Sequence, residues 1–123
     1  MSKVFLVMGS ILSLIGVAAG AFGAHGLRES LSSESLHTFE IAVRYQMYHS
    51  FALIVAGWAL DKYERRQFVK AGWLFLSGVA LFSGSLYILV LTGAKWLGAV
   101  TPFGGLAFLT GWFFLAKGFW KLR

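Results

Sequence analysis

The fold of this chain is decided by residues 4–23, which read VFLVMGSILSLIGVAAGAFG and contain no charged side chain. A helix needs about 20 consecutive apolar residues to cross the hydrocarbon core of a bilayer. Lys3 precedes this run and His25 follows it. Residues 4–23 therefore predict a membrane-spanning helix.

The composition of the whole chain indicates that lipid is its solvent. Hydrophobic residues make up 58% of the 123 residues and charged residues 13%, against about 45–50% and about 25% in soluble domains. A soluble fold of this length could not bury so much apolar surface. We expect a single transmembrane domain over residues 1–123.

Three further apolar runs predict membrane spans, at about residues 41–60, 71–91 and 102–119. The second run ends at the charged residues 61–66, and Lys70 introduces the third. Thr101 and Pro102 mark the start of the last helix, because threonine can cap free N–H groups and proline is favoured at the first helical position. The predicted fold class is all-α, a compact four-helix transmembrane bundle.

The polar residues 25–40 are expected to lie outside the membrane, between the first two spans. Ser32 or Ser33 can cap a helix that carries Glu34 in its first turn. We therefore expect the second helix to begin above the membrane and to enter it without a break.

Lysine and arginine residues are distributed unequally about the four predicted spans. The side of the two termini holds eight of them: Lys3, Lys62, Arg65, Arg66, Lys70, Lys117, Lys121 and Arg123. The other side holds three: Arg28, Arg44 and Lys95. The positive-inside rule then places both termini in the cytoplasm, as in a multi-pass protein of the cell membrane.

The net charge of +6 and the absence of cysteine limit the functions to be considered. The basic residues lie at the ends of apolar runs, where they suit membrane orientation and anionic headgroups, so nucleic acid is not a predicted partner. Without cysteine the chain has no disulfide, thiolate metal site or thiol nucleophile. The predicted partners are membrane lipid and, beyond lipid, a second copy or another membrane protein.

Small residues recur at four-residue spacing along the predicted spans. In lipid, such faces let helix backbones approach closely. The pairs include Gly9/Ser13, Gly16/Gly20, Ala19/Gly23, Ala80/Gly84 and Ala107/Gly111. Four helices can satisfy these faces within one bundle, so the faces do not by themselves require an oligomer.

Two polar residues are predicted to lie deep in the membrane. Counting about 1.5 Å per residue from Asp61 puts His49 roughly 18 Å and Gln46 roughly 22 Å above the cytoplasmic boundary. Polar side chains on other spans reach similar depths, and a polar layer would include Ser13, Ser83 and Tyr87. Two interpretations stay open: hydrogen bonds that hold the helices together, or a proton-linked or ligand-binding site centred on His49.

Glu40 and Arg44 are four residues apart in the order that favours a helical ion pair. They form either a pair at the outer membrane surface or the entrance to a site. His25 is a further candidate, but it lies twelve residues from His37, which is not a local ligand spacing. No intramembrane acid is placed to orient His49 for catalysis. We therefore predict no metal, no cofactor and no enzymatic activity.

Four sequence blocks resemble a known family of small membrane proteins. They are residues 20–27 (GAFGAHGL), 45–50 (YQMYHS), 81–87 (LFSGSLY) and 101–105 (TPFGG). In this order they are similar to the domain of unknown function 423 family, which includes homologues of transmembrane protein 256. The resemblance covers nearly the whole chain and implies a four-helix integral membrane protein. It brings no activity, cofactor or catalytic residue with it.

The sequence thus predicts a non-enzymatic membrane protein that acts by packing against itself, lipid or a membrane partner. The alternative is a small transport or proton-linked module centred on His49, with Glu40 and Arg44 at its outer entrance. A water-filled path to His49 would favour the alternative. A dry interior, with His49 bonded to a neighbouring helix, would favour the first interpretation.

Overall fold

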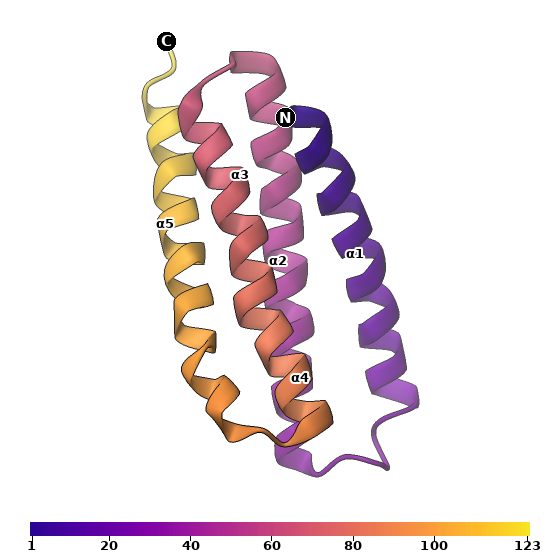
Figure 1. Ribbon diagram of the computed structural model, residues 1–123. Coiled ribbons are helices and arrows are strands. Elements are labelled where there is room, and N and C mark those ends of the chain that lie inside the picture. The colour runs from indigo at the N-terminus through magenta and orange to yellow at the C-terminus, as the bar shows by residue number, and fades with distance from the viewer.

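The computed structural model describes residues 1–123 as helices joined by short connections (Figure 1). Four rods run side by side. The elements are α1 (Ser2–His25), α2 (Ser33–Tyr63), α3 (Arg66–Gly78), the π-helical turn η1 (Val79–Ser83), α4 (Gly84–Thr92), the 3-10 turn η2 (Lys95–Ala99) and α5 (Thr101–Trp120). Because α3, η1 and α4 follow one another without a break, they make the third rod. The all-α prediction is confirmed.

The ends of α2 follow from local chemistry. Ser32 is the N-cap, and its hydroxyl oxygen accepts the Ser35 N–H at 3.1 Å. The cap predicted at Ser32 or Ser33 is therefore confirmed, and the helix begins well before residue 41. At the other end Glu64 adopts a left-handed conformation (φ 51°), which turns the chain directly into α3.

The start of α5 differs from the prediction in one respect. The helix begins at Thr101, and Pro102 lies in its first turn as expected. Thr101 does not cap the helix, however, because its hydroxyl donates to the Leu97 carbonyl at 3.2 Å. That carbonyl belongs to the preceding turn η2. The Thr101 hydroxyl therefore bonds to a residue before α5 and not to a free N–H group in the first turn of α5.

Three of the four rods are long and apolar enough to cross a membrane: Ser2–His25, Arg66–Thr92 and Lys95–Trp120. The prediction of four such spans is correct for these three. α2 is long enough but less apolar, because Arg44, Gln46 and His49 interrupt its hydrophobic surface. Its role as a fourth span therefore stays a prediction.

The rods pack as two hairpins joined through their inner members. α1 packs mainly on α2, α5 packs mainly on α3, and α2 contacts α3, η1 and α4. α1 and α5 consequently lie at opposite edges of the bundle (Figure 1). The two termini and the turn between α2 and α3 share one end of the molecule.

The third rod packs on α5 through phenylalanines of α3 and η1 that face glycines of α5. Both residue types repeat every seven residues along their helices. The facing pairs are Phe68 with Gly118, Phe75 with Gly111, and Phe82 with Gly104. A Cβ atom added at Gly111 would lie 2.8 Å from Cδ1 of Phe75. These glycines are therefore needed for the close approach of the two helices.

The α1–α2 pair uses the same device with other partners. Three buried glycines, again seven residues apart, face long side chains of α2. The pairs are Gly9 with Ile54, Gly16 with Met47, and Gly23 with Phe39. The expected small-residue packing is present, but the repeat that organises it is seven residues rather than four.

The apolar core lies in the half of the bundle that carries the termini. Its fully buried side chains include Phe5, Leu53, Phe68 and Phe75, drawn from α1, α2 and α3. Alanines of α2 and α3 fill the space between them. The buried polar residues gather beyond this core, toward the opposite end.

The contribution of a facing glycine to the stability of the protein can be measured on α5. We expect Gly111→Val to destabilise the protein by about 1–3 kcal/mol, because the added side chain overpacks against Phe75. Gly105→Val is the matched control on the same helix, since a Cβ at Gly105 meets no atom within 4 Å. Thermal unfolding of the two variants in detergent micelles tests the difference. Equal melting temperatures would contradict the packing described for α3 and α5.

Candidate functional site

Gln46 ties three rods together. Its side chain is only 2% exposed. The amide nitrogen donates to the Leu12 carbonyl of α1 at 2.7 Å, and the amide oxygen accepts the Tyr87 hydroxyl of α4 at 2.6 Å. The structure thus brings Gln46 and Tyr87 into one network that joins α1, α2 and α4.

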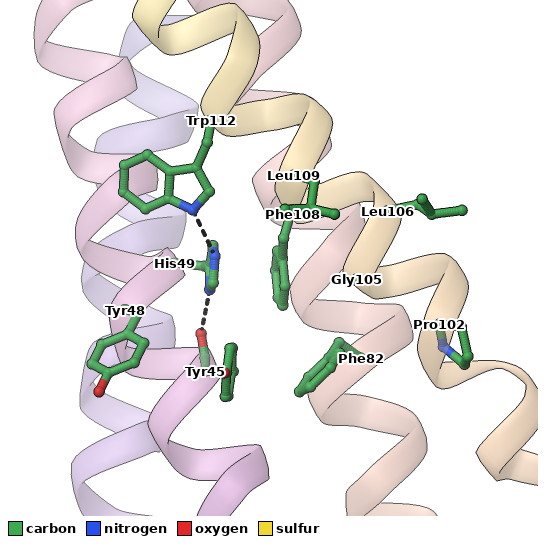
Figure 2. Close-up of a pocket in the computed structure, with 10 residues that line it drawn as sticks. All are labelled: Tyr45, Tyr48, His49, Phe82, Pro102, Gly105, Leu106, Phe108, Leu109 and Trp112. Atoms are coloured by element: carbon green, nitrogen blue, oxygen red, sulfur yellow. Dashed lines mark hydrogen bonds between the residues drawn. The ribbon is translucent and has the colours of Figure 1, made fainter.

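His49 has both ring nitrogens engaged within the protein (Figure 2). Nδ1 lies 2.7 Å from the Tyr45 carbonyl oxygen, and Nε2 lies 3.0 Å from the indole nitrogen of Trp112 on α5. A carbonyl oxygen only accepts and an indole N–H only donates. The partners therefore fix the neutral imidazole with its proton on Nδ1 and with Nε2 as acceptor.

Aromatic rings surround the His49 imidazole. Phe108 of α5 stacks on it with a centroid distance of 3.5 Å and an interplanar angle of 8°. Phe75 and Trp112 approach at steeper angles, with centroids 5.8 Å away. His49 is 4% exposed. Protonation of Nε2 in this position would place two N–H donors against each other in an apolar enclosure.

The predicted serines divide into two groups. Ser83 reaches across to α2, where its hydroxyl donates to the Ala42 carbonyl at 2.7 Å. Ser13 does not join the layer, because its hydroxyl donates to Gly9 of its own helix at 2.8 Å. Such back-bonding to the carbonyl four residues earlier is common for serine within helices. The predicted depth of Ser13 did not suffice to predict its partner, because the hydroxyl bonds within its own helix and does not reach another one.

The π-helical turn η1 lies at the centre of the polar layer. Its i→i+5 hydrogen bond runs from the Gly84 N–H to the Val79 carbonyl. Ser83 ends the turn and bonds to α2, and Tyr87 follows one helical turn later and does the same. Single π turns within helices often occur at functional sites. This one sets the two side chains that connect the third rod to α2.

Several participants in the polar layer were missed from the sequence. Ser85 lies 2.6 Å from Thr101 through their hydroxyl oxygens, and Ser50 donates to the Gln46 carbonyl at 2.6 Å. Trp112 is the most consequential omission, because it supplies the partner of His49 from α5. The available signal was an indole N–H within an apolar span, since a buried indole N–H usually requires an acceptor.

All buried side-chain nitrogen and oxygen atoms have a hydrogen-bond partner. In this network the partners are the protein's own backbone and side chains. Bonds such as those from Gln46 to Leu12 and from Ser83 to Ala42 join different helices.

The candidate residues predicted near the outer membrane surface, Glu40, Arg44 and His25, take no part in this hydrogen-bond network. Glu40 and Arg44 are exposed and line a shallow pocket of about 160 Å³ beside Gly20 and Gly23 of α1. The pocket beside Glu40 and Arg44 shares no lining residue with a second, larger pocket that has His49 in its wall and is described next. His25 is exposed at the end of α1, and no three metal-ligating side chains gather anywhere in the structure.

A larger groove opens on the side of the bundle, between α2 and α5 (Figure 2). It has a volume of about 700 Å³, and His49 lies in its wall. Its ten lining residues are Tyr45, Tyr48, His49, Phe82, Pro102, Gly105, Leu106, Phe108, Leu109 and Trp112. We call this the α2–α5 groove. The α5 residues in it recur at helical spacing, which was the one sequence signal that could have revealed it.

Apolar rods around a closed polar network define a helical membrane protein. The chain belongs to the family described as "Protein of unknown function (DUF423)", which matches residues 19–105. The resemblance seen in the sequence is thereby confirmed.

Two bacterial relatives are similar over nearly their full length. The UPF0382 membrane protein SH2409 of Staphylococcus haemolyticus is 47% identical, with 92% of each chain covered. The UPF0382 membrane protein YwdK of Bacillus subtilis is 46% identical over 89% of this chain and 90% of that protein. No solved structure matches the chain. The names of these relatives describe membrane proteins and state no activity.

The Gln46–Tyr87 bond can be tested by removing one hydroxyl. Tyr87→Phe leaves the buried Gln46 amide oxygen without its donor, so we expect a loss of about 1–3 kcal/mol. Tyr48→Phe removes a hydroxyl from an exposed side chain and serves as the control. Unfolding of both variants should be compared in the same micelles. Equal stability would show that the hydroxyl contributes nothing to helix association.

The tautomer of His49 is accessible to nitrogen NMR. We expect a neutral ring at pH 7 with the proton on Nδ1, because the Tyr45 carbonyl and the Trp112 N–H impose that arrangement. In Trp112→Phe, which lacks the N–H donor, the Nε2 resonance should shift. A proton found on Nε2 in the native protein would contradict the geometry.

Proposed function

We propose that the protein is a four-span protein of the cell membrane that acts by packing against lipid or a membrane neighbour. Catalysis and solute movement are not part of this proposal. One observation carries it: the buried polar atoms are all satisfied internally, while the α2–α5 groove opens sideways with almost wholly apolar walls. A surface of this kind suits a hydrophobic neighbour.

The position of α2 supports its assignment as the fourth span. It lies between α1 and the third rod, both of which are apolar enough to cross a membrane (Figure 1). Its Gln46 and His49 side chains are buried against other helices. Polar groups within a membrane are tolerated in that arrangement, because neighbouring helices satisfy them.

The distribution of charge supports a cytoplasmic location for both termini. The two ends of the chain and the α2–α3 turn lie together (Figure 1), and this is the end that carries most of the lysines and arginines. Such a concentration favours the cytoplasmic side and anionic headgroups. Single-site labelling from either side of a sealed vesicle would test the orientation.

The proton-linked alternative has less support. A proton relay passes protons along hydrogen bonds between groups that can take them up and release them. The two partners of His49 are a backbone carbonyl and an indole N–H, which do not titrate near neutral pH. The pocket beside Glu40 and Arg44 has no wall in common with the α2–α5 groove. Direct contacts of His49 are with aromatic rings and backbone rather than with a charged group.

Flux measurements separate the two functions. Native protein and His49→Ala should be reconstituted in vesicles that report internal pH, with protein-free vesicles as the baseline. We expect equal flux for the native protein, the variant and the baseline, together with a lower melting temperature for His49→Ala. The reason is that the variant loses the bond to Trp112 and the stacking on Phe108. Proton flux above the baseline that disappears in His49→Ala would overturn the proposal.

A further inference from the structure

We propose that the C-terminal end of α5 binds the headgroup of an anionic phospholipid. The site is a pocket lined by Phe113, Ala116, Lys117, Trp120 and Lys121, which we call the lysine pocket. The phosphate would lie between the two ammonium groups, and the adjoining part of an acyl chain would lie against Phe113. This inference rests on the proposed function, and it names the class of lipid and the residues that hold it.

Lys117 and Lys121 present their charges on one side of α5. The Lys121 N–H donates to the Lys117 carbonyl at 3.2 Å, so the helical repeat continues as far as Lys121. Residues four apart in that repeat have Cβ atoms about 5–6 Å apart, and like charges at this spacing are destabilising. Both side chains are exposed and line the same pocket of about 460 Å³. An anion held between them would remove their mutual repulsion.

The protein itself supplies no carboxylate to the lysine pocket. The acidic residues at this end of the molecule are Asp61 and Glu64, and they line a different pocket with Met1 and Ser2. Met1 and Ser2 belong to the start of α1, which lies at the opposite edge of the bundle from α5 (Figure 1). The counter-charge for the two lysines must therefore come from outside the chain.

Other lysines at the same end have a partner within the protein. The Lys62 Nζ atom lies 5.3 Å from the ring centroid of Trp58, and the Lys70 Nζ atom lies 5.1 Å from that of Phe114. An aromatic face attracts a cation through its quadrupole. Lys62 and Lys70 are as exposed to solvent in class as the lysines of the pocket. They therefore provide a matched control for the pocket.

The lysine pocket changes from apolar to cationic along the helix axis. Phe113 is 60% exposed, and Trp120, near the charged end, is 90% exposed. From Phe113 to Lys121 the distance along the axis is about 12 Å. Indole rings are enriched at the membrane–water interface, where lysines meet anionic headgroups. A phospholipid has the same order of groups, from acyl chain to phosphate.

An acidic protein segment in water fits the lysine pocket less well than a phospholipid. Such a segment could meet the two lysines at the end of the helix. It would not reach Phe113, because this residue lies within the apolar span Lys95–Trp120. A phospholipid is already present at both levels of the membrane and can contact both parts of the pocket.

The proposal can be tested by quenching of Trp120 fluorescence. The native protein is reconstituted in phosphatidylcholine with increasing amounts of phosphatidylglycerol that is brominated in its acyl chains, and separately with brominated phosphatidylcholine. The Trp120 signal is the difference in emission between the protein and its Trp120→Phe variant. We expect half-maximal quenching at a roughly tenfold lower mole fraction of the anionic lipid, because each lysine adds attraction to an anionic headgroup. At 1 M salt this difference should shrink, since the Debye length falls to about 3 Å.

Two double variants separate the lysine pocket from the general charge of this end. Lys117→Gln/Lys121→Gln removes two positive charges from the pocket, and Lys62→Gln/Lys70→Gln removes two from elsewhere at the same end. We expect the first to bring the two lipids within about twofold of each other, and the second to keep most of the preference. All four side chains are exposed, so melting temperatures near that of the native protein should show that both variants are folded.

Two outcomes would overturn the proposal. One is equal quenching of Trp120 by the two brominated lipids in the native protein, which would leave the lysines to an acidic partner outside the membrane. The other is an equal loss of preference in the two double variants, which would show that the net charge of this end attracts the lipid and that the pocket does not. Neither outcome depends on proton flux, so failure of the proposed function would be seen separately.

Discussion

The structure depends on one constraint: a polar group inside a membrane must find its partner within the protein. Gln46 meets this constraint with both ends of its amide, binding Leu12 on one side and Tyr87 on the other. His49 meets it with both ring nitrogens. Because each bond reaches a defined atom on another helix or within α2, the network fixes how the rods are rotated relative to one another.

The glycine repeats complement this network in a different way. Facing pairs such as Phe75 with Gly111 set how closely two helices approach, whereas hydrogen bonds set which faces meet. Dispersion contacts between close helices replace the hydrophobic effect, which is weak between helices already in lipid. α2 and α5 each pack mainly on other elements, and the groove at His49 lies between them.

Features of the sequence that act locally could be predicted, whereas features that depend on helix pairing could not. The Ser32 cap acts within three residues, and the apolar spans follow from composition. The depth of Ser13 was estimated from the helical rise, but depth does not show which way a side chain points. Trp112 was missed because the partner of His49 depends on the register between α2 and α5, which no local pattern contains.

The π turn at Val79–Ser83 has a consequence for the mechanics of the third rod. A π turn holds one residue more than an α turn, so it shifts the faces of the helix that follows it relative to the helix that precedes it. If the turn relaxed to α geometry, the residues after it would rotate by about 100° relative to those before it. Tyr87 would then leave Gln46, and the Ser83 bond to Ala42 would be strained. Those two hydrogen bonds therefore hold the π turn in place. α4 can rotate about its axis only if the bonds of the polar layer break.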